Sequence, residues 1–169
     1  MALKQLKKFQ KLACEMGAVD AKVIEAKSVV TAPWVRLKCQ FGCGGYGGTL
    51  TCPPYSPTPE RTQSTIDCFE KALLIHGDEH TEISRVAAAL EKELFLAGYY
   101  KALAFGSGPC RGCRSCDVTE PCKKPEIARP SMEAAGIDVF QTARNNGFQI
   151  QVLTSYECEP NYFGLVLAQ

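Results

Sequence analysis

Ten cysteines, most of them gathered in two short segments, constrain this chain more than any other feature of its 169 residues. Cysteines in small secreted proteins usually pair as disulfides, whereas clustered cysteines in intracellular proteins more often ligate metals or carry redox chemistry. The first residues include lysines but no apolar stretch after them, so we expect no signal peptide and a cytoplasmic protein. On that expectation, the clustered cysteines are predicted to be metal ligands.

The more regular cluster lies in the segment GPCRGCRSCDVTEPCKKPEIARP. Cys110, Cys113 and Cys116 follow one another at intervals of three residues, and Cys122 comes after five more residues. A loop that wraps a [4Fe-4S] core supplies ligands at such short, even spacing, whereas zinc sites more often use two separated cysteine pairs. The pattern predicts a [4Fe-4S] cluster, with zinc as the alternative. In bacterial ferredoxins the fourth cysteine follows after three residues and is itself followed by a proline. Cys122 departs from that pattern, so it ligates either this cluster or another one.

Basic residues surround this segment and outnumber its acidic ones; they are Arg111, Arg114, Lys123, Lys124 and Arg129. A cluster with four thiolate ligands is an anion, so nearby cations favour its reduced form and raise its potential. The same charges suit docking to an acidic redox partner protein, and they equally suit a loop that is simply solvated.

The second cluster consists of Cys39, Cys43 and Cys52, within a stretch so rich in glycine and proline that no helical period fits it. We therefore expect a long loop, of the kind that is usually functional or disordered. A [4Fe-4S] cluster here needs a fourth ligand, for which Cys158 and Cys68 are available, or it leaves one iron open to a small substrate. The alternative is that these are buried structural thiols, because cysteine is among the most buried residue types.

Two other cysteines, Cys14 and Cys68, lie in segments with a helical apolar period. We expect both to be thiols of the hydrophobic core. Cys158 stands in a polar segment and remains a possible additional ligand.

Alternating helical and extended patterns predict an α+β or α/β fold, with a single mixed sheet, packed helices and two cysteine-rich loops at one end. Residues 1–169 have the length of one domain, here a metal-binding one. The predicted helices are 3–16, 59–69, 83–97, 131–135 and 139–146. The predicted strands are 19–30, 34–37, 72–76, 99–105, 148–154 and 163–167. The predicted loops are 39–60 and 106–125.

Charge and hydropathy exclude two classes of partner. The net charge is +1, which gives no general attraction to nucleic acid or acidic membranes. No apolar run approaches the ~18 residues that a membrane span requires. We expect neither a nucleic-acid nor a membrane partner.

Three stretches resemble a family catalogued as predicted metal-binding proteins, domain of unknown function 2284. They are residues 35–60, residues 110–147 and the terminal NYFGLVLA. The resemblance covers nearly the whole chain and implies seven metal-ligating cysteines: Cys39, Cys43, Cys52, Cys110, Cys113, Cys116 and Cys122. It implies little about activity.

Three functions follow from these patterns. The first is a small redox protein with one or two [4Fe-4S] clusters that transfers electrons to or from a partner protein. The second is an enzyme in which a cluster held by three cysteines offers an open iron for reductive or sulfur-transfer chemistry. The third is a protein in which structural zinc ties the two loops together.

Overall fold

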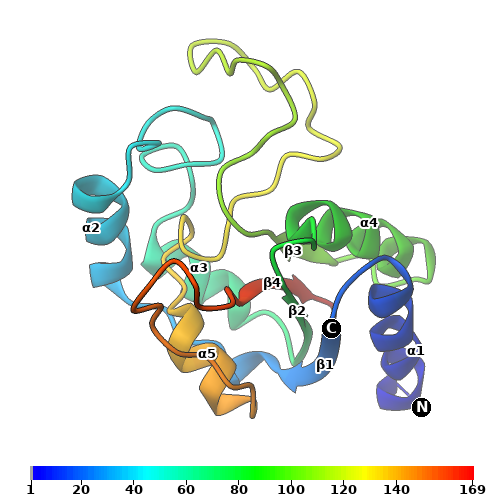
Figure 1. Cartoon of the computed structure of the whole chain (residues 1–169). Coiled ribbons are helices and arrows are strands. Elements are labelled where there is room, and N and C mark those ends of the chain that lie inside the picture. The colour runs from blue at the N-terminus through cyan, green and yellow to red at the C-terminus, as the bar shows by residue number, and fades with distance from the viewer. Residues whose placement is uncertain (1) are drawn as a thin grey trace.

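An antiparallel sheet of four strands, in the order β1-β2-β4-β3, forms the centre of the molecule (Figure 1). The structure is a computed structural model, and it describes residues 2–169. The strands are β1 (Asp20–Glu25), β2 (Lys71–Gly77), β3 (Leu103–Phe105) and β4 (Tyr162–Leu167). In the register, Leu74 lies opposite Lys22 of β1 and Leu165 of β4, and Phe105 of β3 lies opposite Leu165. Every strand pair in this sheet is antiparallel, which confirms the α+β class.

The two faces of the sheet belong to two hydrophobic clusters because side chains alternate along each strand. On β2, Leu73 and Ile75 point to the face covered by α1 (Ala2–Glu15) and α4 (Ile83–Leu96), which pack against each other. The predicted helical segments 3–16 and 83–97 are thus confirmed, and their apolar stripes fill this side of the core.

The opposite face of the sheet receives Leu74, together with side chains of α3 (Pro59–Ile66) and α5 (Val139–Asn145). Between these helices runs a turn over residues 131–137, whose Met132 and Ile137 are fully buried. The start of α3 is as predicted: Thr58 caps the helix by accepting a hydrogen bond from the Arg61 amide at 3.3 Å.

The largest error of the sequence-based prediction concerns residues 34–37, which were expected to be extended. They belong to the helix α2 (Pro33–Gly42), and Cys39 lies on this helix instead of in the predicted loop 39–60. Pro33 occupies the first turn, where its fixed φ suits a helix. The helix was hard to recognise because Trp34 and Phe41 are exposed, so its apolar residues do not mark a single core-facing stripe.

Other boundaries also differ from the prediction. Residues 131–135 form turns instead of a helix, and 148–154 form no strand, although Phe148 and Ile150 are buried individually. The predicted helix to residue 69 ends at Ile66, the strand 99–105 shrinks to β3, and the extended segment 19–30 shrinks to β1. In each case buried apolar side chains follow a regular spacing in the sequence, but the backbone hydrogen bonds of a helix or strand do not continue over the whole predicted range.

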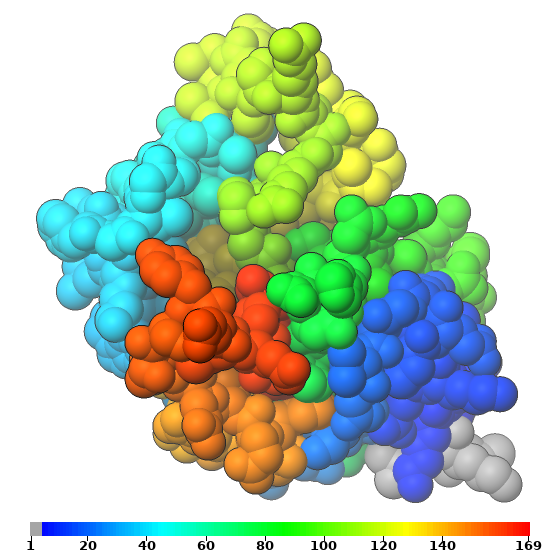
Figure 2. All heavy atoms as spheres, in the orientation of Figure 1, coloured from blue at the N-terminus to red at the C-terminus, as the bar shows by residue number. Residues whose placement is uncertain are grey.

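Both cysteine-bearing segments lie at one end of the molecule, as predicted. The segment 106–130 leaves β3 and projects from the body of the fold, and the segment 43–58 lies next to it (Figures 1 and 2). The fold therefore places the two irregular segments side by side at this end of the molecule.

Candidate metal centres

The loop 107–130 is closed at its base by hydrogen bonds to the fold. Gly106 donates to the Pro130 carbonyl at 2.8 Å, and its own carbonyl accepts from Met132 at 3.0 Å. The hydroxyl of Ser84, on α4, donates to the Ser107 carbonyl at 2.9 Å and accepts from the Ser107 amide at 3.1 Å. A Cβ on Gly106 would lie 2.3 Å from the Ser84 hydroxyl oxygen, so only glycine permits this contact.

A largely buried ion pair fixes the C-terminal end of the same loop. Arg129 donates to Glu91 of α4 through Nη2 at 2.6 Å and through Nε at 2.8 Å. Glu91 Oε2 also accepts from the Ala104 amide on β3 at 2.5 Å. The bidentate pair raises the pKa of Arg129, outweighing the opposing effect of burial. The Glu91 carboxylate therefore joins α4, β3 and the loop.

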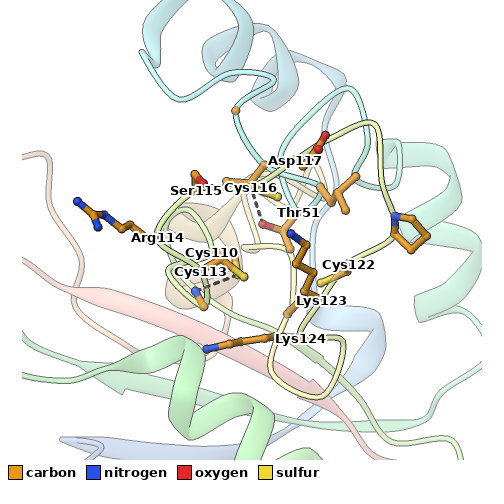
Figure 3. Close-up of a pocket in the computed structure, with 16 residues that line it drawn as sticks. Thr51, Cys110, Cys113, Arg114, Ser115, Cys116, Asp117, Cys122, Lys123 and Lys124 are labelled. Carbon is orange, nitrogen blue, oxygen red and sulfur yellow. Dashed lines mark hydrogen bonds between the residues drawn. The ribbon is translucent and has the colours of Figure 1, made fainter.

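A cavity of about 230 Å³ lies inside the loop (Figure 3). Four thiols line it: Cys110, Cys113, Cys116 and Cys122. Residues 48–51 of the other cysteine-bearing segment also line it. The volume is several times the ~30 Å³ that one water molecule occupies in the liquid. The fold brings all four cysteines predicted for the first centre around one space that is large enough for more than a single ion.

The backbone of this loop is nearly free of internal pairing. Within the described chain, no backbone amide from residue 107 to residue 126 donates to a backbone carbonyl. The amide of Gly112 instead points to Cys110 Sγ at 3.5 Å (Figure 3). Backbone donors that lack partners need water or another acceptor, and sulfur atoms at the centre of the loop are acceptors within reach.

Charge on the loop is distributed around the cavity. Arg111, Arg114, Lys123 and Lys124 are exposed, and Arg114, Lys123 and Lys124 also line the cavity. Figure 3 shows the Arg114 side chain extending away from the cysteines toward solvent. These cations therefore lie close to the thiols, and within the described residues none of them forms an ion pair.

The second group of cysteines forms around the end of α2. Cys39 lies on the helix and Cys43 is its C-cap, so the two are four residues apart and share one face. Cys52 follows in a segment with its own turns: Gly47 donates to the Pro53 carbonyl at 2.9 Å, and Cys52 donates to the Thr49 carbonyl at 3.0 Å. Unlike residues 107–126, whose amides donate to no backbone carbonyl, this segment is held by its own backbone hydrogen bonds.

The electrostatics of Cys39 indicate which groups surround it. Burial raises the pKa of the Cys39 thiol, and the nearby charges of Cys43, Glu133 and Cys52 raise it further. Arg36, one turn earlier on α2, acts in the opposite direction but more weakly. The structure therefore brings the three predicted cysteines into one neighbourhood and adds a carboxylate that the sequence did not single out.

The remaining cysteines lie elsewhere. Cys14 and Cys68 are exposed, which contradicts the prediction that they are core thiols; both sit on the outer side of amphipathic segments. Cys158 lies in the irregular segment before β4, where Ser155 and Thr154 bind its sulfur. Among the described residues it neither lines the cavity of Cys110 nor influences Cys39.

Single-ion geometry is absent from the described chain: in residues 2–169, no three His, Cys, Asp or Glu side chains converge closely enough to hold one metal ion. Sequence reasoning missed two charged residues that influence Cys39, Glu133 and Arg36. Nothing in the local sequence distinguishes Glu133 from a solvated glutamate, because its burial depends on segments distant along the chain.

Comparison with known proteins gives one finding. A family model described as "Predicted metal-binding protein (DUF2284)" matches residues 22–168. No curated protein and no solved structure matches the chain. Within the described residues, no helix has both the length and the apolar character needed to cross a bilayer.

Proposed function

The chain belongs to the DUF2284 family of predicted metal-binding proteins, and from that premise we propose that it binds iron–sulfur clusters and transfers electrons to or from a partner protein. Cys110, Cys113, Cys116 and Cys122 hold one [4Fe-4S] cluster. Cys39, Cys43 and Cys52 hold a second centre. The family is described as predicted metal-binding, and the identity of the metal is our proposal.

The cavity of about 230 Å³ lined by four cysteines carries this proposal. In a closed zinc site, thiolates meet a single ion at about 2.3 Å, and little free space remains between them. Here the thiols stand around a space instead of converging on a point. That arrangement favours a core of several atoms, and the even spacing of the cysteines favours the same cluster.

The chain's own residues supply binding, charge and orientation. When bound, a [4Fe-4S] cluster supplies one-electron transfer. The four thiols supply its anionic ligands, and backbone amides of the loop, of which that of Gly112 points to Cys110 Sγ, supply donors toward sulfur. The exposed cations Arg111, Arg114, Lys123 and Lys124 favour the more negative, reduced state and offer a basic surface to an acidic partner.

The test is the metal and acid-labile sulfide content of anaerobically purified full-length chain, with an absorption spectrum before and after dithionite. About eight irons and eight sulfides per chain, with bleaching on reduction, support two clusters. About four irons restrict the proposal to the loop that carries Cys110. Zinc without sulfide overturns it and leaves a structural metal protein.

A second candidate function is small-molecule chemistry at the cluster. A groove of about 830 Å³ runs along the first half of α4 and shares Cys110 and Gly112 with the smaller cavity. This volume is within the usual range for small-molecule sites. The groove adjoins Cys110, whereas the sequence had favoured an open iron at Cys39. A shift in the cluster's spectrum on adding a small substrate distinguishes this function from electron transfer alone.

A further inference from the structure

The segment 43–58 contributes a wall to the cavity of the loop 107–130, and this wall is rich in hydrogen-bond donors. Gly48, Thr49, Leu50 and Thr51 line the cavity together with the four cysteines of the loop. Within the described chain, the amides of Thr49, Leu50 and Thr51 donate to no backbone carbonyl. Donors without a protein acceptor need water or another group to accept from them, and the cavity is the space beside them.

Two threonine hydroxyls in this wall share one hydrogen bond. Thr49 Oγ1 and Thr51 Oγ1 lie 3.0 Å apart, and either oxygen can donate to the other. Each hydroxyl carries one hydrogen, so the pair has two donors, of which the mutual bond uses one. These hydroxyls form no other hydrogen bond within the described residues. One hydrogen of the pair is therefore left over and needs an acceptor outside the protein.

The position of Thr51 decides where that hydrogen goes when the cavity holds an anion. Thr51 is only 8% exposed, and Figure 3 shows it among the cysteines that surround the cavity. Its hydroxyl hydrogen thus has two destinations, Thr49 and the cavity. A charge-assisted hydrogen bond is about twice as strong as a neutral one, so an anionic acceptor in the cavity takes it. Thr49, which is more exposed, then donates to Thr51, and both hydrogens are used.

The backbone holds Thr51 in place before any metal binds. The Cys52 amide donates to the Thr49 carbonyl at 3.0 Å, which closes a turn around Thr51. The Gly47 amide donates to the Pro53 carbonyl at 2.9 Å and ties the two ends of this turn together. The loop that the turn faces lacks such amide-to-carbonyl bonds. Thr51 is therefore a preorganised donor beside a loop whose backbone has no comparable support.

We propose that the Thr51 hydroxyl, oriented by Thr49, donates a hydrogen bond to a sulfur of the cluster in the loop 107–130 and raises its reduction potential. A donor to sulfur stabilises the more negative, reduced state more than the oxidised one. Thr51 is a positioning residue and supplies no ligand. This assignment rests on the proposed function, because it requires a cluster in this cavity. It gives the segment 43–58 a role toward the first cluster that does not depend on the second centre.

The test is a redox titration of full-length chain that carries Cys39→Ala, which removes a ligand proposed for the second centre and leaves one transition to follow. Into this parent we introduce Thr51→Val, an isosteric change that removes the hydroxyl, or Thr51→Ser, which retains it. Thr65→Val is the matched control, because Thr65 is exposed on α3 and its hydroxyl donates to the Arg61 carbonyl at 2.9 Å. Iron and sulfide content and circular dichroism check that each variant is loaded and folded.

We expect Thr51→Val to lower the potential, so that the ratio of oxidised to reduced cluster at a fixed potential rises about fivefold. Thr49→Val removes the donor that orients Thr51, so it should shift the ratio in the same direction but by less. Thr51→Ser and Thr65→Val should match the parent. If Thr51→Val binds no cluster, the shift in Thr49→Val decides the question by the same measurement.

The results that overturn the assignment are distinct from those that overturn the proposed function. An unchanged potential in loaded Thr51→Val, or an equal fall in Thr51→Val and Thr51→Ser, shows that the hydroxyl does not act on the cluster. An unchanged potential in Thr49→Val shows the same where Thr51→Val stays empty. In these cases the cluster and the proposed function stand. If neither the parent nor the wild type holds iron and sulfide, the proposed function fails and the assignment with it.

Discussion

Arg129 and Glu91 form a bidentate ion pair, 2.6 Å between Nη2 and Oε1, in which both side chains are less than one-fifth exposed. Glu91 belongs to α4, whereas Arg129 closes the loop that carries Cys110. The same carboxylate accepts from the Ala104 amide on β3. The pair therefore holds the loop that carries Cys110 at a fixed position on the helix and the sheet.

Removing the carboxylate should destabilise the fold. Glu91→Ala leaves the Arg129 guanidinium and the Ala104 amide without their acceptor, so we expect the free energy of unfolding to fall by about 2–4 kcal/mol. Denaturant unfolding of the metal-free chain measures this. The double variant Glu91→Met with Arg129→Met should recover part of the loss, because no charge is then left buried and unpaired.

The control for this experiment is an exposed pair at the start of the same helix. Arg85 and Glu82 lie 3.2 Å apart, but their side chains are 83% and 73% exposed. Glu82→Gln should therefore change stability by less than about 1 kcal/mol. Equal effects of the two substitutions would show that burial of the Glu91 pair contributes nothing.

Cysteine substitutions should separate ligands from bystanders. Cys116→Ser removes one thiol from the cavity, so we expect the iron content to fall by about four per chain. Cys14→Ser changes an exposed thiol on α1 and should leave iron and sulfide unchanged. Iron and sulfide assays on both variants measure this. Full iron content in Cys116→Ser would exclude the four-cysteine cluster.

Metal should order the loop that carries the first cluster. The amides of residues 107–126 have no backbone acceptors in the described chain, so they should exchange rapidly with solvent without metal. We expect cluster loading to slow their exchange, as measured by hydrogen–deuterium exchange mass spectrometry. The segment 43–58 has its own turns and should change less. Equal protection with and without metal would contradict a loop organised by a cofactor.

Cys158 should be a reactive thiol at neutral pH. Hydrogen bonds, chiefly from the Ser155 hydroxyl at 3.5 Å, lower the pKa of Cys158 to about 7. Such a thiol is about half ionised at pH 7, whereas an ordinary thiol is only a few per cent ionised. Alkylation should therefore rise with pH through a midpoint near 7, as followed by peptide mass spectrometry.

Ser155→Ala removes the main hydrogen bond to this sulfur. The midpoint of alkylation should then move to higher pH, and the rate at pH 7 should fall several-fold. Cys68 is exposed and provides the internal reference within each sample. If Cys158 and Cys68 react at the same rate in both proteins, the hydrogen bonds do not activate Cys158.

The elements that could be predicted from sequence are those whose signal is local. The apolar period of 83–97 and the Thr58 cap both depend on residues within a few positions, and both agree with the structure. Helix α2 escaped prediction because Trp34 and Phe41 are exposed on it. The segment 148–154 looked like a strand, but the sheet provides it with no partner.

For the candidate centres too, sequence predicted what depends on neighbouring residues and missed what depends on distant ones. Local spacing identified Cys110, Cys113 and Cys116 as one group, and the structure places Cys122, whose partner the spacing left open, around the same cavity. The second group could be named from sequence but not completed, since its surroundings include Glu133, 81 positions beyond Cys52. Only a folded chain brings such distant groups together.

The sequence by itself therefore determined the chemistry of this protein: a thiol-rich, metal-binding chain with an α+β fold, recognisable from spacing and periodicity. Tertiary structure alone decided where that chemistry is placed. It closed the loop of Cys110 through Arg129 and Glu91, and it joined the turn at Ala134 to the segment that follows Cys52 through the Ser56 hydroxyl. The physical reason is that spacing is a property of neighbouring residues, whereas burial and charge convergence arise from long-range packing.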